Sequence, residues 1–182
     1  LVETNFFGPV ALTRLLIPHL RRYVELRPKT RARIVNISSI GGLIGLPWEP
    51  FYHASKFALG GFTESLSLEV WNQGIRTTVL CPGAIKTPLL PKTIASAERA
   101  IAAASNLNYA SGLRAFSQLG LRASRLGLPP ERAARVIGGL LKTTNPPLRR
   151  LIGVDAKLLF LLSRLLPLAA FHRLMRATFA PA

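Results

Sequence analysis

Four polar side chains occur in an order that would suit the transfer of a proton to or from a substrate oxygen: Asn5, Ser39, Tyr52 and Lys56. Tyr52 and Lys56 are four residues apart, so they share one face of a helix. A free tyrosine has a pKa of about 10, which is too high for a base near neutrality. A lysine ammonium one helical turn away favours the phenolate, so we expect Lys56 to lower the pKa of Tyr52. The pair alone is weak evidence, because this spacing often arises by chance.

The position of Ser39 strengthens the prediction. Ser39 follows the apolar run at residues 33–38, which is typical of a buried strand, and so it would lie where that strand ends. Ligands of open α/β sheets bind outside the carboxyl ends of the strands. There Ser39 could donate a hydrogen bond to a substrate oxygen as charge develops on it. Tyr52 would begin the next helix, where the positive end of the helix dipole favours an anion.

The elements that must position these residues alternate between helices and strands. Apolar residues at helical spacing predict helices over residues 4–26 and 51–72, and β-branched runs predict strands over 33–38 and 75–80. Gly74 would cap the second helix at its C-terminal end, since glycine commonly ends helices. Long crossover helices between short apolar strands indicate a doubly wound α/β fold with parallel strands.

The second half of the chain is less regular. Residues 89–128 are rich in Ala, Ser, Leu and Arg and predict irregular helices over the site. Pro129 and Pro130 then start a helix that runs to about Leu141, and residues 148–154 predict a last short strand. We divide the chain into residues 1–154, which carry the predicted site, and a C-terminal helical tail at 155–182.

Charge is distributed unevenly along this chain of 182 residues with a net charge of +16. Residues 1–80 carry nine Lys/Arg and five Asp/Glu, whereas residues 81–182 carry fifteen and three. Either the basic half contacts an acidic partner, or it is an ordinary solvated surface. Cys81 is the single cysteine, which excludes an internal disulfide and favours a reducing compartment. We expect it to be buried and chemically inert at a strand end.

The motifs resemble those of the classical short-chain dehydrogenase/reductase family, on the segments Thr4-Asn5-Phe6-Phe7-Gly8, Ser39-Ile40-Gly41-Gly42 and Tyr52-His53-Ala54-Ser55-Lys56. The resemblance is close over residues 1 to about 90 and looser to about 154. It implies the C-terminal part of a doubly wound Rossmann-type fold, because the family's first strands and Gly-rich phosphate loop are missing from this sequence.

The resemblance also implies roles for the four polar residues. Tyr52 corresponds to the proton donor and acceptor, Lys56 to the residue that also holds the nicotinamide ribose, and Ser39 to the serine that polarises the substrate. Asn5 is similar to the helix asparagine that binds a relay water. A helix cap is the common alternative for such an asparagine, but the presence of the other three residues favours the relay.

A second family motif follows the strand at 75–80. Cys81-Pro82-Gly83-Ala84-Ile85-Lys86-Thr87 resembles the stretch whose backbone meets the nicotinamide carboxamide and whose threonine reaches the cofactor. The implied cofactor-binding residues are Tyr52, Lys56, Pro82, Gly83, Ile85 and Thr87. A plain strand-ending turn is the alternative. The cofactor would be NAD or NADP, since the residue that selects between them is not in this sequence. His19, His53 and His172 lack the spacing of metal ligands, so no metal is expected.

The tail resembles those of retinol- and hydroxysteroid-dehydrogenase-like members, through Gly153-Val154-Asp155-Ala156-Lys157-Leu158-Leu159 and Leu165-Leu166-Pro167. Its apolar run is too short to span a membrane. Two interpretations stay open. The basic, amphipathic tail lies on an anionic membrane surface, or its apolar face packs on the enzyme and roofs the substrate pocket. Trp48 and Phe51 would line that pocket or belong to the core.

We therefore expect an oxidoreductase that transfers a hydride between NAD(P) and a hydroxyl or carbonyl of a small apolar substrate, of steroid, retinoid or lipid type. We expect a cytoplasmic protein, at most peripheral on a membrane, that forms a dimer or tetramer through the helices at 4–26 and 51–72, with Phe62 and Leu66 in the interface. The alternative is a non-catalytic basic interaction module or an inactive remnant. A nucleic-acid binder is disfavoured because aromatic residues are not interleaved with the basic ones.

Overall fold

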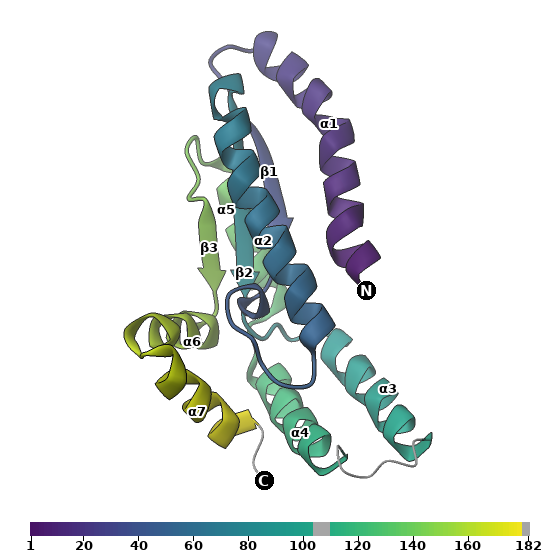
Figure 1. Ribbon diagram of the computed structural model, residues 1–182. Helices are drawn as coiled ribbons and strands as arrows, with labels where there is room; N and C mark the ends of the chain where they lie inside the picture. The colour runs from purple at the N-terminus through teal and green to yellow at the C-terminus, as the bar shows by residue number, and fades with distance from the viewer. Residues whose placement is uncertain (104–109, 180–182) are drawn as a thin grey trace.

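The computed structural model describes residues 1–103 and 110–179 of the chain (Figure 1). The chain begins with a π-helical turn η1 (Glu3–Phe7), which runs directly into α1 (Gly8–Glu25). The elements after it are β1 (Ala32–Ile37), the short helix η2 (Ile40–Gly42), α2 (Pro50–Val70), η3 (Trp71–Gln73), β2 (Ile75–Pro82), α3 (Leu89–Ala103), α4 (Ala110–Leu126), α5 (Pro130–Lys142), β3 (Arg149–Ile152), α6 (Val154–Leu165) and α7 (Leu168–Phe179). The predicted elements are confirmed to within a few residues. The parts of the predicted segments 89–128 and 155–182 that fall at 104–109 and 180–182 lie outside the described residues.

The three strands form one parallel sheet in the order β1-β2-β3. β2 is central: Ile34 of β1 faces its Thr77 in register, and Leu151 of β3 faces its Cys81. Figure 1 shows α2 on one face of the sheet, α5 on the opposite face and α1 beside the β1 edge. Parallel strands with helices on both faces are the doubly wound arrangement that the sequence predicted.

Two apolar clusters hold the helices to the sheet. On one face, Ala32 and Ile75 of the strands pack with Leu66 and Val70 of α2. Leu66 is only 5% exposed, so its predicted place in a subunit interface is wrong: the side chain belongs to the core. Phe62 is partly buried against the same cluster. On the other face, Leu80 and Ile152 pack with Leu140 of α5, so β2 is buried on both sides.

In the described part of the chain, β1 pairs only with β2, and its other edge faces α1 across a cavity of about 580 Å³. Leu12 and Leu16 of α1 and Val35 of β1 line this cavity. Near the carboxyl end of β1 the cavity also reaches Asn5 and Lys56.

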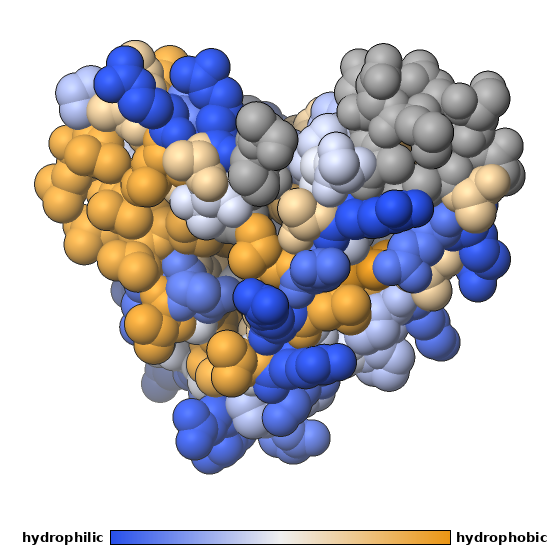
Figure 2. Space-filling view, turned by 90° about the horizontal axis from the view of Figure 1, so that it is seen from below, coloured by the Kyte–Doolittle hydropathy of each residue, from blue (hydrophilic) through white to orange (hydrophobic). Residues whose placement is uncertain are grey.

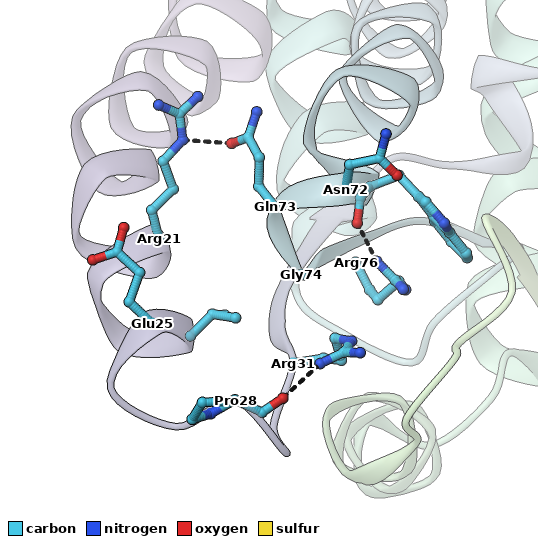
Figure 3. Close-up of a pocket in the computed structure, with 10 residues that line it drawn as sticks. Arg21, Glu25, Pro28, Arg31, Asn72, Gln73, Gly74 and Arg76 are labelled. Atoms are coloured by element: carbon cyan, nitrogen blue, oxygen red, sulfur yellow. Dashed lines mark hydrogen bonds between the residues drawn. The ribbon is translucent and has the colours of Figure 1, made fainter.

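The opposite end of the sheet carries a basic groove of about 750 Å³, which Figure 3 shows. Gly74 turns the chain there with a φ of 73°, a conformation that glycine adopts without steric cost. Arg76 is buried, lies over the Trp71 ring and donates a hydrogen bond to the Trp71 carbonyl at 2.8 Å. Arg21 donates to Gln73 and Arg31 to the Pro28 carbonyl. These guanidinium groups are bonded to helix and loop ends rather than directed together at a common point.

The tail folds back onto the loop that follows β1. Phe171 and Met175 of α7 are buried against Ile44, and Leu159 and Leu162 of α6 pack against the same cluster. Seen from below in Figure 2, apolar residues gather on the lobe that α6 and α7 form. Among the helices of the described residues, none is both long and apolar enough to cross a membrane.

Candidate active site

Ser39, Tyr52 and Lys56 meet at the carboxyl edge of the sheet, as their spacing predicts. Ser39 follows β1, and Tyr52 and Lys56 lie in the first two turns of α2. Ser39 and Tyr52 line the same cavity, and hydrogen bonding by the Ser39 side chain lowers the pKa of Tyr52. The Ser39 hydroxyl also accepts a hydrogen bond from the Gly41 amide at 3.0 Å, because Ser39 caps the short helix η2. The substrate-polarising candidate and the proton-transfer candidate are therefore adjacent.

The environment of Tyr52 favours the neutral phenol. Burial raises the pKa of Tyr52, the hydrogen bond from Ser39 opposes this rise, and the carboxylate of Glu49 adds to it. Glu49 lies one helical turn before Tyr52, and burial also raises the pKa of its carboxyl group. The prediction that Lys56 lowers the pKa of Tyr52 is thus contradicted in this arrangement. Burial, which disfavours the charged phenolate, is the largest cause of the shift, and Lys56 is not among the groups that produce it.

Lys56 directs its ammonium to the end of β1. Its Nζ donates a hydrogen bond to the Ile37 carbonyl at 2.9 Å and lies 6.0 Å from the centroid of the Tyr52 ring. Burial lowers the pKa of Lys56. The ammonium therefore stands between the last residue of β1 and Tyr52, with donor capacity left for a further acceptor, since an ammonium has three N–H groups.

Asn5 reaches the site through another residue. It lies inside the π-helical turn η1, and its Nδ2 donates to the Ser55 hydroxyl at 3.1 Å. Ser55 in turn donates to the Tyr52 carbonyl at 2.7 Å. The helix-cap alternative for Asn5 is wrong, because the side chain binds a different helix. π-helical turns are frequent at functional sites. The water relay inferred for Asn5 stays a prediction.

Two supporting residues escaped the sequence analysis: Ser38 and Ser55. The Ser38 hydroxyl donates to the Lys56 carbonyl at 3.0 Å, and a Cβ on Gly42 would overlap the same hydroxyl. This contact fixes the end of β1 against α2. Ser55 is almost fully buried and joins Asn5 to Tyr52. Ser55 lies inside a recognised motif, and Ser38 comes directly before one, which was the available signal.

His53 has a structural role, because both of its ring nitrogens are hydrogen-bonded to the backbone. It is buried, its Nδ1 bonds to the Gly41 carbonyl at 2.8 Å, and its Nε2 accepts from the Leu46 amide at 3.1 Å. Because Nε2 is an acceptor, Nδ1 carries the hydrogen and donates. The residue lines the pocket and holds two points of the connection between β1 and α2, at Gly41 and Leu46.

A mainly apolar cavity of about 510 Å³ opens beside the Ser39 and Tyr52 hydroxyls. Its far wall comes from α3 and α4 and includes Leu90, Ile94 and Phe116, and α6 adds Leu159. Trp48 lines the cavity, with a φ of 73° that is uncommon for a non-glycine residue and often found at functional sites. Phe51 lies outside the cavity and is 74% exposed, so its predicted role as pocket lining or core is wrong.

The turn after β2 lies at the same edge of the sheet. Gly83 and Ala84 line the cavity with Ser39 and Tyr52. Neighbouring elements hold the turn from two sides: the Leu128 amide donates to the Ala84 carbonyl at 2.9 Å, and the Ala84 amide donates to the Asp155 carboxylate at 2.7 Å. Asp155 is a further residue that the sequence analysis did not assign to the site.

Cys81, at the end of β2, is fully buried. Burial raises the pKa of its thiol to about 11, so the reactive thiolate is scarce near neutrality. The expectation of an inert, buried thiol is confirmed. In residues 1–103 and 110–179, no group of three or more His, Cys, Asp or Glu side chains is arranged to hold a metal ion.

Comparison with known proteins gives a consistent result. A family model described as short chain dehydrogenase matches residues 1–98. The chain is 32% identical over 163 residues to a 3-ketodihydrosphingosine reductase of Bacteroides thetaiotaomicron, an alignment that covers 90% of this chain and 57% of the relative. It is 34% identical over 153 residues to human retinol dehydrogenase 8, covering 81% and 46%. The chain thus spans about half the length of these curated relatives.

A solved structure agrees with the sequence relatives. The fold matches a short-chain dehydrogenase from Streptomyces avermitilis with a TM-score of 0.71 and 29% identity, over 98% of this chain and 61% of that one. The family model covers more than half of the chain, and it includes the Ser39, Tyr52 and Lys56 motifs. The chain therefore belongs to the short-chain dehydrogenase family.

Proposed function

We propose that the protein is an NAD(P)-dependent oxidoreductase that interconverts a hydroxyl and a carbonyl group on an apolar substrate. The observation that carries this proposal is the Ser39–Tyr52 hydroxyl pair at the wall of an apolar cavity, with the Lys56 ammonium one helical turn further on. Ser39 would hydrogen-bond the substrate oxygen, and Tyr52 would give a proton to that oxygen during reduction and take it back during oxidation.

The residues present fit the nicotinamide end of such a cofactor. The Lys56 ammonium projects at the end of β1, where it can donate to a ribose hydroxyl, and the turn at Pro82, Gly83, Ile85 and Thr87 borders the same edge. When bound, the cofactor would supply or accept a hydride at the substrate carbon. Asn5 would act through Ser55, which fixes the backbone of Tyr52. Family membership supports NAD or NADP without distinguishing between them.

The walls of the cavity support an apolar substrate. Apolar side chains from α3, α4 and α6 face the Ser39 and Tyr52 hydroxyls, and Glu49 and Asp155 are the carboxyl groups among its described lining residues. The names of two relatives, retinol dehydrogenase and 3-ketodihydrosphingosine reductase, refer to substrates with long apolar portions. We propose a steroid-, retinoid- or lipid-like molecule whose reactive oxygen enters first.

A chain-length series of ketones tests this proposal on the full-length protein. We expect NAD(P)H-dependent reduction with kcat/KM rising along the series, because burial of each CH₂ group contributes about 0.8 kcal/mol, or roughly fourfold. Short hydroxylated ketones serve as the control and should be poor substrates. Equal rates for polar and apolar ketones would contradict the substrate class. Absence of NAD(P)H binding would favour the alternative, a non-catalytic interaction module.

We also propose that the full-length protein forms a homo-oligomer through α1 and α2. With Leu66 in the core, other residues must form the contact. Leu15 of α1 and Leu68 of α2 are strongly exposed and are the best candidates. Exposed leucines on neighbouring helices favour association between copies, since isolated subunits leave such residues in water.

The tail supports peripheral contact with an anionic membrane surface. Val154, Leu158, Leu161 and Leu165 recur at helical spacing on the outer face of α6 and are more than half exposed. Lys157 and Arg164 are exposed beside them. The same helix sends Leu159 into the cavity, so the two interpretations of the tail are compatible: one face of α6 forms pocket wall and the other presents leucines and basic groups outward. An apolar stripe flanked by basic residues suits the interface of an anionic bilayer.

Co-sedimentation with phosphatidylserine-containing vesicles tests the membrane contact. We expect the full-length protein to bind at low salt and to be released as salt rises, because screening weakens the basic attraction. Replacing Leu158 and Leu161 by serine should weaken binding roughly tenfold or more, since less apolar surface is buried. The matched control is Leu141→Ser on α5, where the leucine is also about half exposed. Lack of binding at low salt would contradict the proposal.

A further inference from the structure

The segment Gly153-Val154-Asp155-Ala156 joins the last strand to the tail, and its geometry centres on one carboxylate. Gly153 has a φ of 100° and precedes α6, so the chain turns sharply as it leaves β3. Ala156 is fully buried, which anchors the first turn of α6. Asp155 lies between them and extends across to the turn after β2, 71 residues earlier in the sequence.

The contact with that turn is specific. The Asp155 Oδ2 accepts a hydrogen bond from the Ala84 amide at 2.7 Å, a length typical of a charge-assisted bond. A Cβ on Gly83 would overlap both oxygens of this carboxylate, and a Cβ on Gly153 would overlap its Oδ1. The carboxylate therefore occupies a space that exists only because both neighbours are glycine. The start of a helix is also a favourable place for its negative charge.

The bond fixes a short piece of backbone at the site. The Ala84 carbonyl is held by the Leu128 amide, and the Gly83 amide donates to the Ile152 carbonyl at 2.8 Å. With Asp155 on the Ala84 amide, both polar backbone groups of Ala84 are bonded to other elements. Ala84 lies between Gly83 and Ile85, two of the residues proposed to meet the nicotinamide. Its position determines where both of them lie.

We propose that Asp155 is a positioning residue that sets the turn after β2, and with it the nicotinamide, relative to the substrate pocket. This inference rests on the proposed function. Asp155 and Leu159 lie one helical turn apart on α6 and both line the cavity. The helix that forms part of the pocket wall thus also holds the cofactor turn. A misplacement of about 1 Å at a reacting centre can reduce the rate about a hundredfold, so a small shift of this turn would matter.

The test compares Asp155→Ala and Asp155→Asn in the full-length protein, with Glu131→Ala as the matched control. Glu131 occupies the first turn of α5 and is exposed, so its removal also takes a carboxylate from a helix start without touching the cavity. In hydrogen–deuterium exchange without cofactor, we expect the amides around Ala84 to exchange at least tenfold faster in Asp155→Ala and at the wild-type rate in Glu131→Ala. Unchanged exchange in Asp155→Ala would overturn the proposal.

Cofactor titration and kinetics provide the second readout. We expect Asp155→Ala to weaken NADH and NADPH binding about tenfold or more and to lower kcat, whereas Asp155→Asn should recover most of the binding, because its amide oxygen still accepts from Ala84. Gly83→Ala should weaken cofactor binding as Asp155→Ala does, and the double variant should bind no more weakly than either single variant.

Cofactor binding by Asp155→Ala equal to that of Glu131→Ala would overturn the proposal. The proposal would also be overturned if Asp155→Ala and Asp155→Asn lost cofactor affinity equally and in proportion to the fall in their melting temperatures. If wild-type protein bound no NAD(P)H, the proposed function would fail, while the exchange experiment would still report whether Asp155 holds the turn.

Discussion

Replacing Tyr52 by phenylalanine should lower kcat by roughly 10²–10⁴-fold, the usual contribution of a positioned proton donor. Phenylalanine keeps the ring and its edge contact with His53, whose ring centroid lies 5.7 Å away. It removes only the phenol hydroxyl, the group whose pKa Ser39 lowers by hydrogen bonding. Because the apolar contacts remain, the melting temperature should change little, and NAD(P)H binding should persist. The measurement is steady-state turnover of the full-length protein, together with a thermal melt and a cofactor titration.

Tyr23→Phe is the matched control for this experiment. Tyr23 is an exposed tyrosine on α1 that stacks with Arg27, far from the cavity. The same chemical change there should leave turnover at the wild-type level. Wild-type turnover in Tyr52→Phe would show that the proton comes from another group. A large drop in melting temperature would mean that the hydroxyl is needed for folding, and the kinetic loss would then say little about chemistry.

The pH dependence of the wild-type enzyme adds a directional test of Tyr52. Burial and Glu49 raise the pKa of Tyr52, so the phenol stays protonated across neutral pH. Reduction needs the protonated form and should fall only as the pH rises towards that pKa, whereas oxidation needs the phenolate and should increase with pH. Glu49→Gln removes a negative charge, so both profiles should shift to lower pH. A shift to higher pH would contradict the effect assigned to Glu49.

The regular elements could be predicted because their signals are local. The apolar periodicity of α1 and α2 and the β-branched runs of β1 and β2 lie within single segments, and the structure confirms their type and approximate bounds. The proximity of Ser39, Tyr52 and Lys56 could be predicted because the segments that carry them are close in the sequence. The end of a strand and the start of the next helix are neighbours in a parallel α/β unit.

The remaining features depend on contacts between distant segments. Asp155 meets Ala84 across 71 residues, and Asn5 meets Ser55 across 50. No spacing rule indicates such pairs. Leu66 and Phe51 were misplaced because α2 carries apolar residues on more than one face, so helical spacing alone does not identify the face that meets the sheet. The pKa of Tyr52 was misjudged because burial, the dominant cause, is a property of the folded chain.

Replacing Lys56 by methionine should weaken NAD(P)H binding roughly 10–100-fold and also lower turnover. The change keeps a long apolar stem and removes the ammonium that bonds to the Ile37 carbonyl at the end of β1. A hydrogen bond to a charged group contributes about 1.5–3 kcal/mol, which corresponds to that range of affinity. Methionine is close in volume to the stem of lysine, so the Ser38 hydroxyl should keep its bond to the backbone carbonyl of residue 56.

Lys142→Met is the control, because Lys142 is an exposed residue in the last turn of α5. It should bind NAD(P)H and turn over substrate as the wild type does.

The pH profile of Lys56→Met separates two roles for the ammonium. Since Nζ lies 6.0 Å from the Tyr52 ring centroid and binds Ile37, we expect the main loss in cofactor affinity and little displacement of the profile. A displacement to higher pH would show that the ammonium also stabilises the phenolate during the reaction. Normal NAD(P)H binding in this variant would exclude Lys56 from the cofactor site.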